Sequence, residues 1–188
     1  MPDSFRHRLR TETRDDHARV DTRFSKLDLQ AADGFGEFLS VHGSCFGVMH
    51  DICGAAARSA ALLGALTSAI KLDLKSLGLP GPAAPSEPVL GCDPIAIDYM
   101  VAGSRLGSKV LKRNWALSAD ARVKAAGAYF ALTDSGTLWR ETCADLDRID
   151  PDSPRADWVI ADVRSLFTLF ATTHHSPIPD GSERAVLT

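Results

Sequence analysis

One histidine, His17, lies on an otherwise apolar stripe of the N-terminal segment and is the first candidate for a functional side chain. Apolar and small positions recur at helical spacing through residues 4–26, which places this imidazole on the inward face of an amphipathic helix. Histidine is a common axial ligand for iron when its second ring nitrogen is held by a partner. The alternative is a core histidine bonded to a backbone carbonyl.

Two arginines on the neighbouring row of that segment offer a second kind of chemistry. Arg10 and Arg14 are one helical turn apart, so two fixed positive charges lie beside the face of His17. Such a pair suits a ligand that carries carboxylates. A solvated basic edge is the other explanation.

A third candidate is the stretch YMVAGSRLGSKVLKRNW at residues 99–115, in which two glycines interrupt a helical pattern. Gly103 shares one face with Tyr99, Leu106 and Val110, and Gly107 lies beside it. Each glycine costs a helix about 0.5–1 kcal/mol relative to alanine. Bare backbone on an inward face suits either a closely crossing helix or a flat ligand lying against the main chain.

These candidates must be positioned by helices, because no segment alternates with the period of two that is typical of strands. Helices are expected over residues 4–26, 33–49, 55–78, 94–116, 118–132, 137–149 and 154–170. Asp93 and Ser153, each followed by proline, are expected to cap two of them, and Gly78 to end another. The proline-rich residues 79–91 are expected to form a surface connector. The sequence therefore predicts an all-α, single-domain protein over residues 1–175, with a flexible tail at 176–188.

Composition excludes several functional classes. The chain has 188 residues, of which 45% are hydrophobic, and a net charge of −3, so it suits one domain and does not suit nucleic-acid binding. It has no apolar run long enough for a membrane span, and its charged N-terminus differs from a signal peptide, so a cytoplasmic location is expected. The four cysteines show no CxxC spacing and are expected to be free thiols.

Several stretches, in order, resemble the heme oxygenase family. LRTETRDDH at residues 9–17 resembles the opening of these enzymes, whose proximal helix has Leu-(Lys/Arg)-x-x-Thr-x-x-x-His. YMVAGSRLGSKVL is similar to the distal-helix motif of bacterial heme oxygenases, and KLDLKSLG at residues 71–78 resembles their DLxxLG segment. With Tyr129, Phe130, Trp139 and Phe167, the likeness runs from about Phe5 to Phe170.

The resemblance implies a heme-oxygenase-like multi-helix bundle with heme between the N-terminal helix and the glycine-bearing central helix. His17 would ligate the iron, and the catalytic distal face would be lined by Gly103, Ser104, Gly107 and Ser108. Contacts to heme, which is both substrate and cofactor, would come from Arg10, Arg14, Tyr99, Lys112 and Phe167.

The implied reaction is the O₂-dependent cleavage of heme to biliverdin, carbon monoxide and ferrous iron. Electrons would come from a donor such as a ferredoxin or a reductase, and a phytochrome-type protein is one acceptor of biliverdin in bacteria. Arg105, Lys109 and Arg113 recur every four residues, and this row would either receive an acidic donor or be plain solvated surface. Arg140 is a further candidate for a propionate partner.

Two departures from the family pattern leave a second hypothesis open. Ala102 stands where bacterial relatives usually have glutamate, and Ser108 where they have a second glycine. Ser108 is expected close to the distal face, and both changes favour a non-catalytic or weakly active heme- or biliverdin-binding protein. A third hypothesis is thiamin-type hydrolysis in the same architecture, with Cys143 or Cys45 as nucleophile. His42 and His50 are expected to be core or surface residues.

Overall fold

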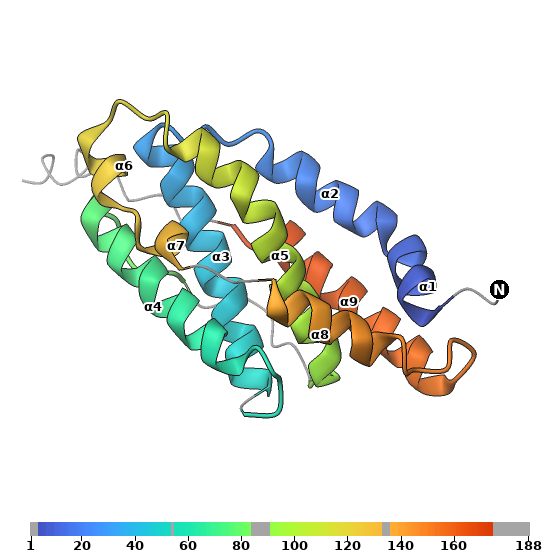
Figure 1. Ribbon diagram of the computed structural model, residues 1–188. Coiled ribbons are helices and arrows are strands. Elements are labelled where there is room, and N and C mark those ends of the chain that lie inside the picture. Colours follow the sequence, from blue (N-terminus) through green and yellow to red (C-terminus); the bar gives the residue numbers. More distant parts are fainter. Residues whose placement is uncertain (1–3, 54, 84–90, 133–135, 175–188) are drawn as a thin grey trace, which may run out of the picture.

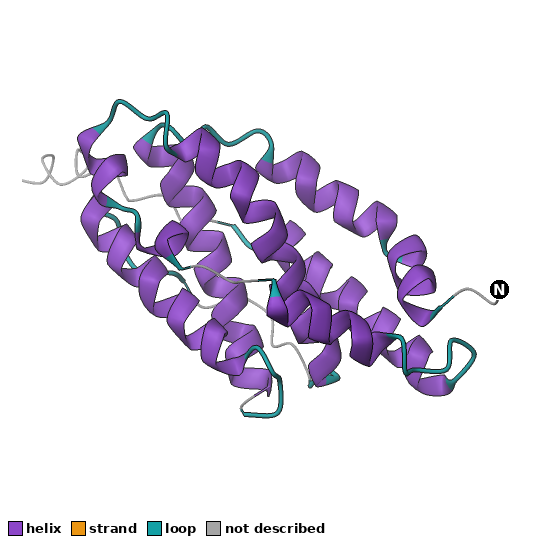
Figure 2. Ribbon diagram, in the orientation of Figure 1, coloured by secondary structure: helices purple, strands orange, loops and turns teal. Residues whose placement is uncertain are grey.

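The structure, a computed structural model, describes residues 4–53, 55–83, 91–132 and 136–174, and every regular element in these ranges is a helix (Figure 2). The helices are α1 (Phe5–Glu12), α2 (Arg14–Phe24), α3 (Ala32–Cys53), α4 (Ala60–Leu77), α5 (Pro94–Trp115), α6 (Ala121–Ala125), α7 (Ala128–Ala131), α8 (Thr137–Leu146) and α9 (Pro154–Thr172). The predicted all-α class is confirmed. The expected tail at 176–188 lies outside the described residues, as do residues 84–90 of the expected connector.

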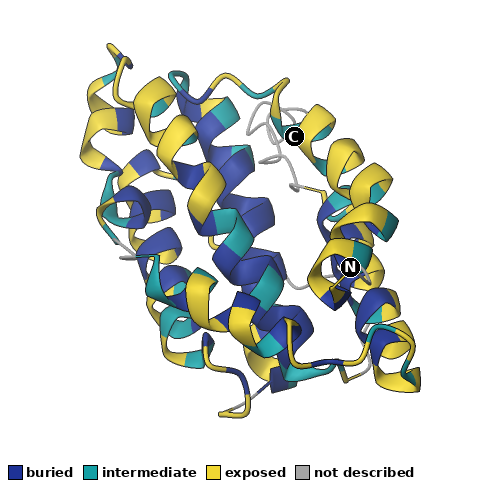
Figure 3. Cartoon of the chain, turned by 45° about the vertical axis from the view of Figure 1, so that its right-hand side comes forward, coloured by how far each residue is buried: buried dark blue, intermediate teal, exposed yellow. Residues whose placement is uncertain are grey.

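Helix α3 lies at the centre of a single bundle (Figure 1). It packs most extensively against α4, while α5 packs against α8 and α9, and α2 packs against α9. The buried residues lie along the faces of the helices that turn toward the interior of the bundle (Figure 3). Aromatic rings of α3 stack inside this core, where Phe35 lies 5.8 Å from Phe130 and Phe38 lies 6.3 Å from the same ring, centroid to centroid.

Several helix ends follow the local rules of capping. The Asp93 carboxylate accepts from the N–H of Ile95 at the start of α5, and the Ser153 hydroxyl accepts from the N–H of Ala156 at the start of α9. Gly78 ends α4 in the left-handed region, at φ 74°. These three predictions are confirmed, and α5 ends at Trp115, one residue before the expected boundary. None of the described helices combines the length and apolar composition needed to cross a bilayer.

The expected helix over residues 4–26 is wrong, because the chain breaks at Thr13 into α1 and α2. Thr13 is buried, and its hydroxyl donates to the carbonyl oxygen of Leu9 at 2.8 Å. A threonine that bonds back to the preceding turn bends a helix. The break allows α1 to insert Phe5 and Leu9 into the core while α2 follows α9.

The expected helix over residues 118–132 is also wrong, because this segment folds as α6 and α7. Ala126 has ψ 73°, which ends α6, and α7 begins at Ala128. Asp73 on α4 accepts from the N–H groups of Ala128 and Tyr129, both at 2.8 Å. A carboxylate from a distant helix therefore starts α7. Smaller differences are that α3 begins before Asp33, α4 begins at Ala60, and α8 ends at Leu146.

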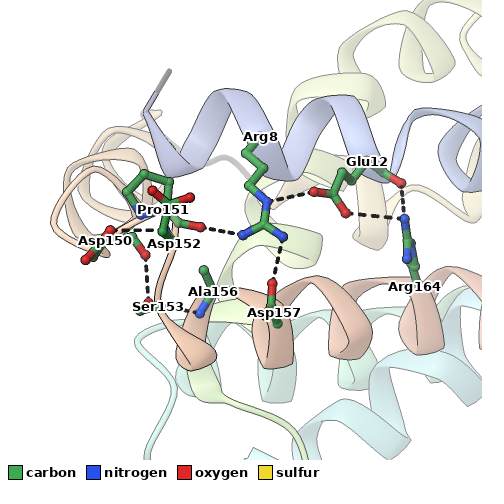
Figure 4. A network of polar contacts seen from close by, with 9 residues as sticks. All are labelled: Arg8, Glu12, Asp150, Pro151, Asp152, Ser153, Ala156, Asp157 and Arg164. Carbon is green, nitrogen blue, oxygen red and sulfur yellow. Dashed lines mark hydrogen bonds and ion pairs between the residues drawn. The ribbon is translucent and has the colours of Figure 1, made fainter. Parts of the chain in front are cut away.

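Helix α1 is fastened to α9 by a polar network (Figure 4). Arg8 donates to Asp157 at 2.6 Å, to Glu12 at 2.7 Å and to the carbonyl oxygen of Pro151. Arg164 on α9 donates to the carbonyl oxygen of Glu12 at 2.9 Å. In contrast, no residue of α2 is fully buried. The helix that carries His17 thus starts from a fixed anchor, and its apolar residues Val20 and Phe24 are only partly buried against the core.

Candidate functional site

His17 lies on α2 with its ring oriented by two neighbours. Nδ1 is 2.9 Å from a carboxylate oxygen of Asp21, one turn further along, and the ring meets Phe167 of α9 edge-on at 5.5 Å between centroids. The side chain is 60% exposed, and no described residue bonds to Nε2. The alternative of a core histidine bonded to a backbone carbonyl is therefore wrong. A carboxylate on Nδ1 leaves the lone pair of Nε2 available, as in histidines that ligate metals.

The glycine face of α5 is open. A Cβ atom added at Gly103 or at Gly107 would meet nothing within 4 Å. The alternative of a closely crossing helix is thus wrong for the described part of the chain. On the same face, Leu106 is 41% and Val110 is 67% exposed. An apolar, nearly bare face without a protein cover is the type of surface that a flat apolar ligand would bury.

The two faces meet at the N-terminal end of the site. Thr13 precedes His17 by one turn, and Tyr99 precedes Gly103 by one turn. Burial raises the pKa of Tyr99, while polar interaction with the Thr13 hydroxyl and the positive charge of Arg10 oppose that rise. Thr13, Arg10 and Tyr99 therefore lie near one another, and His17 and Gly103 each follow this contact by one turn of their own helix.

A second contact joins the far end. Gln30, in the loop after α2, donates from Nε2 to Oδ1 of Asn114 at 3.1 Å, and its carbonyl oxygen accepts from the Ser118 hydroxyl at 2.6 Å. Helices α2 and α5, both fully described, share no extensive contact between these ends. The stretch of α5 from Tyr99 to Asn114 is about 22 Å long at 1.5 Å per residue. We call the region between His17 and the glycine face the α2–α5 site.

The two serines of the expected distal face bond to their own helix. Ser104 donates to the carbonyl oxygen of Val101 at 2.8 Å, and Ser108 donates to that of Arg105 at 2.7 Å. Ser104 flanks the glycine face, whereas Ser108 is buried on another side of α5. The expectation that Ser108 lines or narrows the distal face is wrong, because the helical turn carries its side chain toward the core.

The predicted basic residues differ in whether their charged groups are free to contact a ligand. Arg10 and Arg14 are exposed, and neither guanidinium has a hydrogen-bond or ion-pair partner among the described residues. Lys112 is not brought to the site, because its ammonium donates to the carbonyl oxygen of Phe130 at 2.9 Å. The expected surface row is broken at Arg105, which is buried. Arg140 donates to the Thr137 hydroxyl at the start of α8.

The described side chains limit the metal and thiol chemistry that the protein could perform. No group of three or more His, Cys, Asp or Glu side chains in the described residues would hold a metal ion. A metal at His17 would therefore need most of its ligands from a macrocycle. All four cysteines are free, as predicted, and burial raises the pKa of Cys45 to about 12. Cys45 is thus a poor nucleophile.

Two surface cavities lie elsewhere. One, of about 510 Å³, follows the outer face of α2 at Arg19, Thr22 and Lys26. The other, of about 650 Å³, lies where α4, α5 and α9 begin, and its arginines Arg58 and Arg155 are already paired with carboxylates. Neither cavity includes the open histidine nitrogen or the bare glycine face, so neither offers the same chemistry.

Sequence reasoning missed Asp21, although its spacing of four residues from His17 is a signal for a side-chain pair on one helix face. It also missed Thr13 and Gln30, whose contacts depend on distant segments.

Comparison with known proteins adds nothing to this geometry: no protein-family profile matches the chain, and no curated protein sequence matches it either.

Proposed function

We propose that this protein binds heme in the α2–α5 site and is a heme oxygenase, built on a heme-oxygenase-like helical bundle. One observation carries the proposal. The imidazole of His17 has its Nδ1 held by Asp21 and its Nε2 without a described partner, and the glycine face of α5 is covered by no described side chain. A planar macrocycle with a central iron is the ligand that uses both features.

The residues around the site fit such a ligand. Gly103 and Gly107 allow a flat ring to approach the backbone, and the exposed side chains of Leu106 and Val110 would be shielded from water by it. Phe167 closes the side next to the His17 ring. The guanidinium groups of Arg10 and Arg14, which have no partner in the described ranges, suit the propionate carboxylates.

Heme, when bound, supplies both the iron that activates O₂ and the ring carbon that is oxidised. Nε2 of His17 would hold the iron, and Asp21 would fix the tautomer and orientation of the imidazole. The glycine face would present backbone rather than an acidic side chain to the bound heme. Arg105 is the only ionisable residue between Gly103 and Ser108, and its side chain points away. We therefore assign orientation and water control to the protein and no strong acid to the distal side.

Heme cleavage consumes electrons, and we assign their supply to an external donor. Lys109 and Arg113 remain exposed on α5. We assign to them the contact with an acidic donor such as a ferredoxin, in place of the longer row that Arg105 interrupts. Biliverdin would then pass to an acceptor protein of the phytochrome type, or it would be the by-product of a reaction that releases iron from heme.

A second candidate function is the binding of heme or biliverdin without turnover. Ala102 supports it, because this fully buried residue replaces the family's carboxylate with a methyl group. Ser108 no longer does, since its side chain lies away from the glycine face. Thiamin-type hydrolysis receives no support from Cys45, whose raised pKa disfavours the thiolate.

The test is to mix the purified protein with hemin and record the Soret band of the wild type, His17→Ala and His50→Ala. His50 is an exposed histidine 3.8 Å from Asp51 and serves as the matched control. We expect the ligated band to be lost only in His17→Ala, because the proposal assigns the iron to His17 and not to His50. Absence of the band in the wild type would refute heme binding.

Turnover is tested in the same samples by adding a reductant under air. The appearance of biliverdin absorption as the Soret band decays supports the oxygenase. A Soret band that persists under reductant and oxygen would refute turnover and leave the binding function.

A further inference from the structure

The short helix α7 is held at both ends by charged side chains from other helices. At its start, the N–H groups of Ala128 and Tyr129 donate to Asp73 of α4, both at 2.8 Å. At its far end, Nζ of Lys112 on α5 donates to the carbonyl oxygen of Phe130 at 2.9 Å. A carboxylate at the start of a helix and a cation at its end satisfy backbone groups that the helix leaves unpaired. This helix of 4 residues is too short to be stable alone, so α4 and α5 fix it in place.

Arg105 joins α5 to the same end of α7. Nη2 donates to the carbonyl oxygen of Leu132, the residue after α7, at 2.5 Å, and the guanidinium carbon lies 5.0 Å from the ring centroid of Tyr129. Lys112 follows Arg105 by seven residues, a spacing that returns to the same side of a helix. That side is opposite the glycine face, because Arg105 follows Gly103 by two residues, a rotation of about 200°. Helix α5 is therefore attached to α7 at two points on the side away from its glycines.

The glycine-bearing half of α5 has few other buried contacts. Seven of the nine buried residues of this helix precede Gly103, and only Arg105 and Ser108 follow it. Trp115, at the end of the helix, is partly buried and lies 5.4 Å from Phe130 of α7, centroid to centroid. Glycine loosens a helix because its backbone loses more conformational freedom on folding than that of other residues. Because few of its side chains are buried, this half of α5 depends on its polar contacts with α7.

We propose that Arg105 and Lys112 are positioning residues, which hold the glycine-bearing half of α5 against α7 and so keep the glycine face in place over a bound ligand. Release of a ligand from between α2 and α5 requires this half of α5 to open, and each opening breaks its contacts with α7. The two residues therefore slow the escape of the ligand without touching it. The identity of that ligand as heme rests on the proposed function, whereas the attachment of α5 to α7 does not.

The test is amide hydrogen exchange of the ligand-free full chain, read by mass spectrometry, in the wild type, Lys112→Met and the control Lys71→Met. Both lysines are exposed, but Lys71 on α4 has no side-chain partner in the described ranges. Lysine and methionine have similar helix propensities, so the exchange reports the lost hydrogen bond. We expect Lys112→Met to speed exchange at residues 103–111 about fivefold, as the loss of one such bond from a local opening would.

The first half of α5 is the internal reference for this experiment. Residues 95–101, and the whole helix in the control variant, should exchange as in the wild type. Lys112→Arg, which retains a cation that can donate to Phe130, should restore wild-type exchange. No change at residues 103–111 in Lys112→Met, or an equal change in both halves of α5, would overturn the proposal, because a purely structural contact would affect both halves alike.

Hemin release measures the consequence for a ligand. Transfer of hemin to an excess of apomyoglobin should be about fivefold faster from Lys112→Met than from the wild type, because release follows the same opening. The Soret position should not change, since His17 is untouched. Equal release rates from the two proteins would overturn the positioning role. Absence of hemin binding in the wild type would instead refute the heme proposal, and the exchange experiment would still decide whether α7 holds the glycine-bearing half of α5.

Discussion

His42 provides the sharpest stability prediction, because it is a histidine enclosed by aromatic rings. Its ring lies 4.0 Å from Phe38, 4.8 Å from Phe24 and 5.3 Å from Phe170, centroid to centroid. Nδ1 is 2.9 Å from the carbonyl oxygen of Phe38. Burial lowers the pKa of His42 from 6.5 to about 4, the bond to Phe38 opposes the shift, and the charges of Arg23 and Arg105 add to it.

The sign and size of the effect follow from this shift. The folded chain keeps His42 neutral until about pH 4, whereas the unfolded chain takes up the proton below pH 6.5. Stability is therefore complete above pH 6.5 and falls as the pH drops toward 4. A difference of about 2.5 pKa units at about 1.4 kcal/mol per unit corresponds to a total loss of about 3.5 kcal/mol, which is complete only below pH 4.

The perturbation is His42→Leu, which removes the titrating ring, with His50→Leu as the control on the same helix. Urea unfolding at pH 7.5, 6.5, 5.5 and 4.5 gives the free energy of unfolding of each protein. We expect the wild type and His50→Leu to lose about 2.5 kcal/mol more than His42→Leu between pH 7.5 and 4.5. Other titrating groups, including the buried Asp73, are common to all three proteins. Equal pH slopes in the wild type and His42→Leu would refute the reasoning.

Three further predictions concern other parts of the chain. Gly107→Ala and the control Gly47→Ala should each raise the free energy of unfolding by about 0.5–1 kcal/mol, because neither added Cβ meets another atom. Only Gly107→Ala should weaken hemin binding in a Soret titration. Leu106→Ser should leave the urea midpoint nearly unchanged and raise the Kd for hemin, because this side chain is exposed until a ligand covers it. Asp73→Ala should cost about 3 kcal/mol in urea unfolding, since two buried N–H groups of α7 lose their acceptor; a change below about 1 kcal/mol would contradict that role.

The sequence by itself determined the class of fold and the most regular helices. Helix α5 was predicted within a residue of its ends, because Asp93 and Pro94 start it by local rules and its pattern needs no distant partner. The pairing of His17 with Asp21 was equally local, since four residues separate the two side chains on one helix. Spacing of this kind depends only on the geometry of the helix.

The tertiary structure decided whatever depended on distant segments. The break at Thr13 follows from α1 entering the core, and α7 exists because Asp73 reaches it from α4. The spacing of Arg105 with Lys109 and Arg113 predicted a surface row. Arg105 is buried instead because it packs on α7, which the sequence did not predict as a separate helix.

The exposure of the glycine face also depended on distant segments. Helical spacing places Gly103 and Gly107 on one side of α5, but a closely crossing helix and a flat ligand require the same bare backbone. Only the arrangement of neighbouring helices shows whether that side is covered. In the described part of the chain it is open, because α2 packs on α9 and makes no extensive contact with α5.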